Sequence, residues 1–218
     1  MIFKLRALRD KHLLKVPPRA LEPFVTHLPV LLGVGHLVQA RRILEFGSGN
    51  HSSLAFLDRE CFPHVEHVDS FENDPEWGAS IAAKAAHDSR FRMHLLDGAV
   101  AKAVDDVDIE SYDMIFIDDS VTSAERSATI RAVVARAPTR AVVLVHDFEQ
   151  PPYRHALRGM KHIMRMTALN PNTGVGWNSE VLQMRSVKRL NKMLRQLGEC
   201  DSLPPAAQIS LMIRQTLS

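Results

Sequence analysis

Carboxylates follow one short apolar run after another along the first two thirds of this 218-residue chain. Such acids can accept hydrogen bonds, take up a proton or bind a cation. In chain order they are Glu45, Glu72, Asp97, Asp118 with Asp119, and Asp147. Like charges gathered in one place repel each other, and any single acid could instead be an ordinary helix N-cap. Helix capping could explain any one of these acids, but it explains the whole series less well. The series therefore predicts a functional site.

The runs before these acids have the composition of buried β-strands, and helical segments lie between them. We expect strands at 42–47, 65–72, 91–96, 112–118 and 141–147, and helices at 17–40, 52–60, 74–87, 98–107 and 122–137. Strands separated by helices pair in parallel through crossovers. The carboxyl ends of parallel strands meet at one sheet edge, where such folds bind ligands. The sequence therefore predicts a doubly wound α/β sheet with its acids along one edge.

The chain closes with a different pattern. Two further strands are expected at 163–169 and 175–184, joined by the turn residues NPNTG. This link is too short for a crossover, so the two strands should be antiparallel. Helices are expected at 186–198 and 204–217. We divide the chain into an N-terminal helical leader or cap (1–40), a core (41–184) and a C-terminal helical extension (185–218).

A glycine turn, Gly47-Ser48-Gly49, follows the first expected strand. A phosphate-binding P-loop would continue with lysine and a hydroxyl residue, but Asn50 and His51 follow here. The third glycine of a dinucleotide fingerprint is replaced by Ser52, which disfavours a nicotinamide oxidoreductase. A rim of carboxylates suits a ligand with hydroxyls, amines and positive charge better than one with phosphates.

LEFGSGNHSS (44–53) and VDSFENDPEW (68–77) resemble a class I S-adenosylmethionine-dependent methyltransferase of Rossmann-like fold. The resemblance covers about residues 40–184. It implies a mostly parallel seven-stranded sheet in the order 3-2-1-4-5-7-6, with the last strand antiparallel and helices on both faces. The cofactor-binding residues that it implies are Glu45, Gly47, Ser48, Gly49, Glu72, Asp97, Gly98 and Asp118.

The resemblance gives these residues different parts of the cofactor. Gly47 and Gly49 would pack against the methionine part, with Glu45 near its amino group. Glu72 would accept the ribose hydroxyls, a task that suits a carboxylate. Asp97, with the backbone of the following Gly98 and Ala99, would read the adenine edge, and Asp118 would lie beside the transferring methyl. His51 departs from the family, whose turn usually has a third glycine; it either faces the pocket or begins the next helix.

FIDDS (116–120) and VLVHDFE (143–149) resemble strand ends of metal-dependent small-molecule O-methyltransferases. The resemblance implies a Mg²⁺ site formed by Asp118, Asp119 and Asp147 with waters, although Phe148 stands where that family has Asn. The catalytic candidates are His146, as general base, and Asp118. QPPY (150–153) resembles a motif of nucleic-acid amino-methyltransferases, but it follows the fifth strand instead of the fourth. We interpret its prolines as a helix start.

We therefore predict methyl transfer from S-adenosylmethionine to a small-molecule acceptor, at a hydroxyl oxygen. Two alternatives stay open: a catalytically inactive binding module of the same fold, and an aminopropyltransferase-like enzyme.

The composition sets further expectations. A net charge of +2 gives no sign of a nucleic-acid partner, and we interpret the basic ends (1–19 and 185–218) as solvated helix faces. The apolar stretch 28–38 is too short to span a membrane. Two cysteines make no disulfide framework, so we expect a cytoplasmic protein. The C-terminal helices could cap the site or join two copies in a homo-oligomer.

Overall fold

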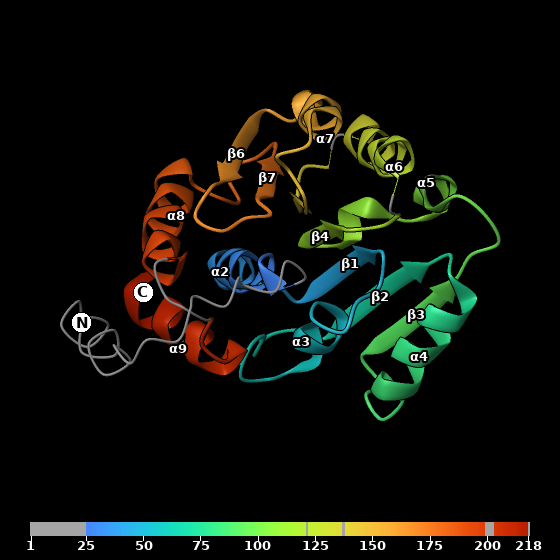
Figure 1. The fold of residues 1–218 in the computed structure, drawn as a ribbon, viewed down its shortest axis with the longest axis horizontal. Helices are drawn as coiled ribbons and strands as arrows, with labels where there is room; N and C mark the ends of the chain where they lie inside the picture. Colours follow the sequence, from blue (N-terminus) through green and yellow to red (C-terminus); the bar gives the residue numbers. More distant parts are fainter. Residues whose placement is uncertain (1–24, 121, 137, 199–202, 218) are drawn as a thin grey trace, which may run out of the picture.

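The computed structural model describes residues 25–120, 122–136, 138–198 and 203–217. Its centre is a seven-stranded sheet in the order β3-β2-β1-β4-β5-β7-β6 (Figure 1). The strands are β1 (Arg42–Phe46), β2 (His67–Glu72), β3 (Phe91–Leu95), β4 (Met114–Ile117), β5 (Val142–Val145), β6 (His162–Met166) and β7 (Thr173–Trp177). The first five pair in parallel, and β7 runs antiparallel to both β5 and β6. The predicted fold and strand order are confirmed.

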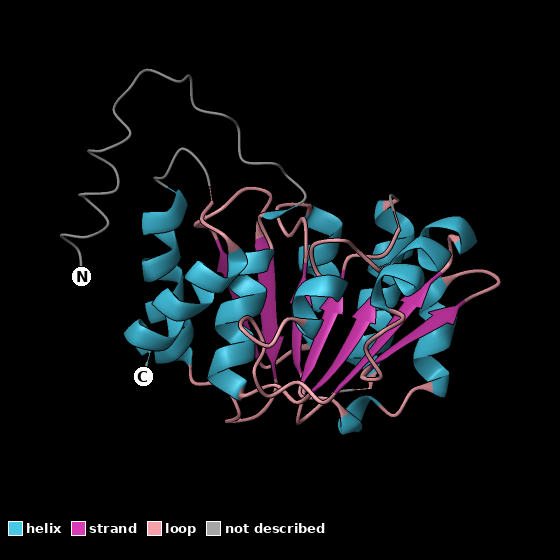
Figure 2. Ribbon diagram, turned by 90° about the horizontal axis from the view of Figure 1, so that it is seen from below, coloured by secondary structure: helices cyan, strands magenta, loops and turns pink. Residues whose placement is uncertain are grey.

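Helices cover both faces of this sheet (Figure 2). They are α2 (Leu28–Val38), α3 (Ser53–Leu57), α4 (Pro75–Ala85), α5 (Val100–Ala103), α6 (Ser123–Ala135), α7 (Pro151–Ala156), α8 (Met184–Gly198) and α9 (Ala206–Leu217). Short 3-10 turns are formed by Val104–Asp106, Ile109–Ser111 and Leu157–Gly159. In the described ranges, none of these helices has both the length and the apolar composition that a membrane span requires.

Each face of the sheet has its own apolar core, because successive strand residues point to opposite faces. Ile43 and Met114 point toward α2, α3, α8 and α9. Their neighbours Leu44 and Ile115 point toward α5, α6 and α7. Helix α2 packs against α8 and α9, so segments from both ends of the described chain share one core with the sheet.

Two predicted helix starts are confirmed. At the start of α4, the Asp74 side chain accepts hydrogen bonds from the backbone N–H groups of Glu76 and Trp77. At the start of α6, the Thr122 side chain accepts one from the backbone N–H of Glu125. Helix α7 begins at Pro151, as expected for the prolines of QPPY. These local signals hold because capping satisfies backbone N–H groups that the helix leaves without partners.

Several expected boundaries were wrong. Within the described part of the expected helix 17–40, the helix spans only Leu28–Val38, with Pro29 in its first turn. Residues 1–24 of the leader lie outside the described residues. The expected helices 52–60 and 98–107 are shorter, and the second passes into a 3-10 turn. The last strand is Thr173–Trp177 instead of 175–184. It ends where the Asn178 side chain bonds to Lys161 N and to the carbonyl of Pro138.

Candidate functional site

The sheet register places three predicted residues next to one another. Phe46 is opposite Ile117, and Ile117 is opposite Val145. The backbone pairing continues beyond the strands, since Asp118 N donates to Phe46 O at 2.8 Å and His146 N to Ile117 O at 3.1 Å. Gly47, Asp118 and His146 therefore begin the loops of three neighbouring strands at one edge.

The glycine turn lies directly on the end of β4. Gly47 has a φ of +88°, a conformation that side-chain-bearing residues rarely adopt. A Cβ at this position would come within 2.5 Å of Asp119 N. The turn therefore requires glycine here both for its backbone conformation and for its contact with β4.

Glu72 holds the turn from the other side. One carboxylate oxygen accepts from Ser48 N at 3.0 Å and from Ser48 Oγ at 2.9 Å. The other accepts from Asn73 N and Asp74 N at 2.8 and 2.9 Å. The indole of Trp77 donates to Ser48 O at 2.7 Å. Glu72 is thus at the predicted place and connects the glycine turn to the start of α4.

Glu45 lies beneath the turn and is fully buried. Its Oε2 accepts hydrogen bonds from Ser53 Oγ and Ser70 Oγ, each at 2.6 Å. Its Oε1 has no hydrogen-bond partner among the described residues. Burial raises the pKa of Glu45 to about 7, even though the serine hydrogen bonds oppose the shift, and the charge of Asp118 adds to it. Sequence reasoning missed both serines.

Asp97 and Gly98 are exposed beyond the end of β3. They line a hollow of about 370 Å³, together with Phe71, His94 and Lys102. The His94 ring stacks on Phe71, with 4.4 Å between ring centroids. The residues that the sequence predicts to contact the adenine, Asp97 and Gly98, line this hollow. His51 is exposed in the turn before α3 and does not form part of that helix.

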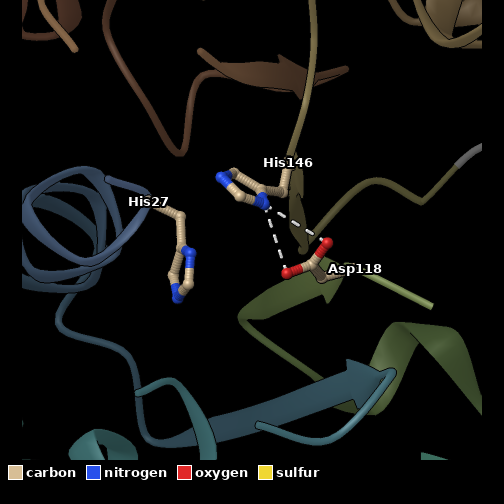
Figure 3. A group of neighbouring side chains, drawn as sticks. All are labelled: His27, Asp118 and His146. Atoms are coloured by element: carbon tan, nitrogen blue, oxygen red, sulfur yellow. Dashed lines mark hydrogen bonds and ion pairs between the residues drawn. The ribbon is translucent and has the colours of Figure 1, made fainter. Parts of the chain in front are cut away.

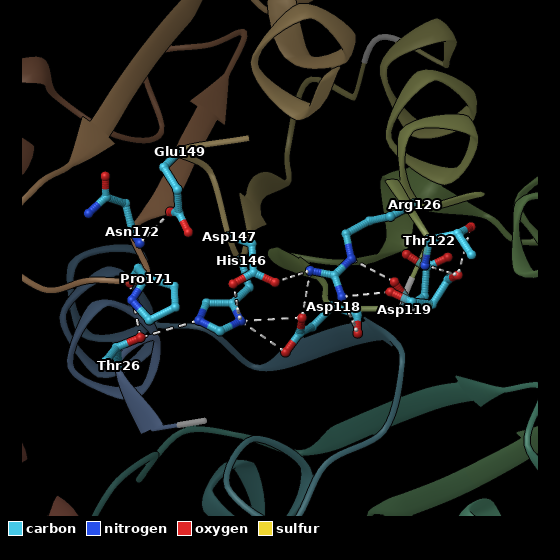
Figure 4. A network of polar contacts seen from close by, with 11 residues as sticks. Thr26, Asp118, Asp119, Thr122, Arg126, His146, Asp147, Glu149, Pro171 and Asn172 are labelled. Atoms are coloured by element: carbon cyan, nitrogen blue, oxygen red, sulfur yellow. Dashed lines mark hydrogen bonds and ion pairs between the residues drawn. The ribbon is translucent and has the colours of Figure 1, made fainter. Parts of the chain in front are cut away.

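His146 and Asp118 lie side by side, as Figure 4 shows. His146 Nδ1 is 3.3 Å from each oxygen of the Asp118 carboxylate. The other ring nitrogen, Nε2, is 3.3 Å from Thr26 Oγ1, whose hydroxyl donates to the carbonyl of Pro171. Burial lowers the pKa of His146, but the bond to Asp118 and its charge outweigh burial and raise the pKa above its usual value. This environment favours the imidazolium form, which donates protons rather than accepting them.

Arg126, which sequence reasoning missed, joins the loops after β4 and β5. Its Nη1 is 2.9 Å from a carboxylate oxygen of Asp118 and 2.9 Å from one of Asp147. Its Nε donates to the carbonyl of Asp119 at 2.6 Å, and the guanidinium lies over the Tyr153 ring. One signal could have identified it. Arg126 shares the buried stripe of α6 with Ile130 and Val133 at helical spacing, where an arginine needs partners.

The three acids of the predicted Mg²⁺ site do not converge. Asp118 and Asp147 share the Arg126 guanidinium, whereas Asp119 turns toward α6 and accepts from Thr129 Oγ1 at 2.6 Å. Burial raises the pKa of Asp119 to about 6. The cation between Asp118 and Asp147 in this structure is an arginine side chain.

A second imidazole, His27, completes the group from the start of α2 (Figure 3). Its ring centroid is 4.8 Å from that of His146 and 5.1 Å from that of Phe116. Burial, with the charge of His146, lowers its pKa to about 3, so the ring is neutral. No motif pointed to His27, because only the packing of α2 on the sheet brings it here.

Comparisons with known proteins agree with this architecture. Residues 44–148 match a family model described as a methyltransferase domain. An O-methyltransferase family protein from Burkholderia thailandensis superposes with a TM-score of 0.53 at 10% identity, over 70% of this chain and 55% of that one. A Klebsiella pneumoniae protein provisionally named an O-methyltransferase gives 0.52 at 16% identity, over 80% and 88%. A spermidine synthase gives 0.51 at 16% identity, over 78% and 68%.

The sheet order and the family match together define the class: the chain has a Rossmann-like α/β methyltransferase fold, and its residues 44–148 match a methyltransferase domain. A curated relative, the Sinorhizobium fredii protein y4gI, is 25% identical over 206 residues, and its name gives no function. The match covers 80% of this chain but 22% of y4gI, so the chain spans about a fifth of that relative's length.

Proposed function

We propose that this protein transfers the methyl group of S-adenosylmethionine to a hydroxyl oxygen of a small molecule. The observation that carries the proposal is the convergence of two sets of residues at one edge of a methyltransferase sheet. The Gly47–Gly49 turn with Glu72 forms one set, and Asp118 with His146 forms the other.

The residues present fit the cofactor. The partnerless Oε1 of buried Glu45 is an acceptor that the cofactor's amino group would satisfy, directly or through a water. Glu72 already accepts a hydroxyl hydrogen bond from Ser48. Because the Ser48 hydroxyl can rotate, a ribose hydroxyl could take its place without disturbing the backbone donors. The hollow lined by Asp97 and Phe71 would hold the adenine.

When bound, the cofactor supplies a methyl group that its sulfonium has already activated. The chain's own residues must then align the acceptor with that methyl and keep water away. A hydroxyl is a weak nucleophile while it keeps its proton. We propose that Asp118, partly exposed at the end of β4 and oriented by buried His146 at the end of β5, accepts the hydrogen bond of the acceptor hydroxyl and takes up its proton.

A transfer assay tests this proposal. The protein is incubated with methyl-labelled S-adenosylmethionine and a panel of phenols, catechols, alcohols and amines, and the labelled products are identified by mass spectrometry. We expect label on oxygen, lost in Asp118→Asn and kept in His155→Ala, which changes an exposed histidine of α7.

Three other results of this assay would each overturn a different part of the proposed function. Label on nitrogen alone would contradict the hydroxyl acceptor. Aminopropyl transfer from decarboxylated S-adenosylmethionine, without methyl transfer, would replace the reaction. Cofactor binding without transfer to any acceptor would support the non-catalytic binding module.

A further inference from the structure

His27, Asp118 and His146 can each direct one ligand atom into a common space. These atoms, an imidazole nitrogen from each histidine and a carboxylate oxygen, all lie within 4.8 Å of one another. In the part of the chain that the structure describes, no other group of three or more His, Cys, Asp or Glu residues meets this condition. The three residues come from the start of α2 and the ends of β4 and β5 (Figure 3).

His27 is a buried histidine whose ring has no hydrogen bonds in the described structure. It is 4% exposed, and neither of its ring nitrogens has a hydrogen-bond partner among the described residues. Buried polar groups in native proteins are almost always bonded, and exceptions often mark a missing ion or water. His94, by contrast, is less buried and bonds to Asp69 at 2.7 Å. An imidazole that has no hydrogen-bond partner and lies beside a carboxylate and a second imidazole is well placed to bind a metal ion.

We propose that His27, Asp118 and His146 form a binding site for one divalent transition-metal ion. Two imidazoles and one carboxylate form a ligand set that suits zinc or ferrous iron, whereas Mg²⁺ prefers oxygen ligands. Such a set leaves coordination positions open for a further ligand.

The geometry requires a small movement. Metal–nitrogen distances near 2.0–2.1 Å place neighbouring tetrahedral ligand atoms about 3.3 Å apart. His146 Nδ1 and the Asp118 carboxylate are already at 3.3 Å, so His27 is the ligand that must approach. No hydrogen bond in the described structure holds its ring in place.

Arg126 supports the same carboxylate from outside. Its Nη1 bonds to Asp118 Oδ1, and both oxygens of that carboxylate are 3.3 Å from His146 Nδ1. Metal-binding carboxylates are commonly held by such outer hydrogen bonds, which fix their orientation. The site differs from the Mg²⁺ site predicted from sequence, since it uses neither Asp119 nor Asp147.

The metal site deepens the proposed function. The existence of the site does not depend on methyl transfer, but the role that we give the metal does. A metal ion held by Asp118 and His146 would lie where we place the acceptor hydroxyl. Bound to the metal, a hydroxyl loses its proton more readily, and the acceptor class would be small molecules whose hydroxyl can bind a metal. His146 would then act as a ligand, and the metal would lower the pKa of the bound hydroxyl so that its proton could pass to solvent water without a general base.

Metal binding can be measured without knowing the acceptor. The full chain is treated with a chelator and titrated with Co²⁺, followed by its visible absorption, and then with Zn²⁺ as competitor. We expect one equivalent of Co²⁺ with a spectrum of nitrogen and oxygen ligands, displaced by Zn²⁺ and unaffected by an equal concentration of Mg²⁺.

The decisive variant is His27→Phe, which keeps an aromatic ring against Phe116 and removes the ligand atoms. Its affinity for Co²⁺ should fall by more than the roughly 10–100-fold that loss of an outer-shell partner costs. Zn²⁺ should raise the Tm of the unaltered protein but not that of His27→Phe. The matched control is His36→Ala, on the same helix α2, which should bind Co²⁺ like the unaltered protein.

Absence of saturable Co²⁺ and Zn²⁺ binding by the folded protein would overturn the site, as would equal binding by His27→Phe and His36→Ala. If His27→Phe does not fold, His27→Asn and Asp118→Asn provide the same comparison. S-adenosylhomocysteine is titrated into the same samples. Its binding without metal binding would refute the metal site alone, and metal binding without it would refute the cofactor alone.

Discussion

Buried Glu45 makes the stability of this protein depend on pH in a direction that is unusual for an acid. Its pKa is raised from 4.5 to about 7, first by burial. Between these two values the folded state keeps a proton that the unfolded state has lost. The stability that protonated Glu45 contributes is therefore fully present below about pH 4.5, and it is lost as the pH rises through about 7.

The magnitude follows from the same two values. A difference between about 7 and 4.5, at about 1.4 kcal/mol for each pKa unit, corresponds to about 3 kcal/mol in total. Most of this, about 2–3 kcal/mol, falls between pH 5 and pH 8. Glu45→Gln removes the titration while keeping an oxygen for the hydrogen bonds from Ser53 and Ser70.

Urea unfolding at pH 5 and pH 8 measures the effect. The unfolding free energy of the unaltered protein, relative to that of Glu45→Gln, should fall by about 2–3 kcal/mol between the two pH values. Glu180→Gln, which changes an exposed acid, should follow the unaltered protein at both. Equal pH dependence of Glu45→Gln and the unaltered protein would contradict the raised pKa of Glu45 in the folded state.

Three further substitutions test other parts of the site. Glu72→Ala should weaken S-adenosylhomocysteine binding by roughly 1.5–3 kcal/mol, the scale for hydrogen bonds to charged groups; unchanged affinity in calorimetry would remove Glu72 from the cofactor site. Gly47→Ala should destabilise the protein by about 1–3 kcal/mol or more in urea unfolding, since its Cβ would meet Asp119 N at a positive φ. Arg126→Met should cost about 2–4 kcal/mol, because it leaves two partly exposed carboxylates without their cation. Arg131→Met, an exposed arginine of the same helix, should cost far less, and similar losses for both would contradict the role given to Arg126.

The sheet could be predicted because its signals are local. Apolar runs such as 112–118, the glycine turn at Gly47 and the caps at Asp74 and Thr122 each report on a few neighbouring residues. Parallel pairing then follows from chain connectivity. The expected end of the last strand was wrong because Asn178, through contacts distant in sequence, stops the pairing.

The sequence could locate only those residues of the site that lie at the ends of strands. The two catalytic candidates, Asp118 and His146, lie together because they follow neighbouring strands, and their catalytic role stays a prediction. His27 and Ser70 reach the site through helix packing and cross-strand contacts, which leave no pattern in the sequence around them. Arg126 is marked in the sequence only by its place on the buried stripe of α6. For the same reason Asp119 was grouped with Asp118, although consecutive side chains after a strand point in different directions.

The most direct test of the cofactor assignment is a calorimetric titration of the purified protein with S-adenosylhomocysteine, with NAD as the control ligand. We expect saturable binding of S-adenosylhomocysteine at one site, no binding of NAD, and weaker S-adenosylhomocysteine binding by Glu72→Ala. A well-folded protein that binds no S-adenosylhomocysteine, or that binds NAD equally well, would contradict the cofactor assignment on which the proposed methyl transfer depends.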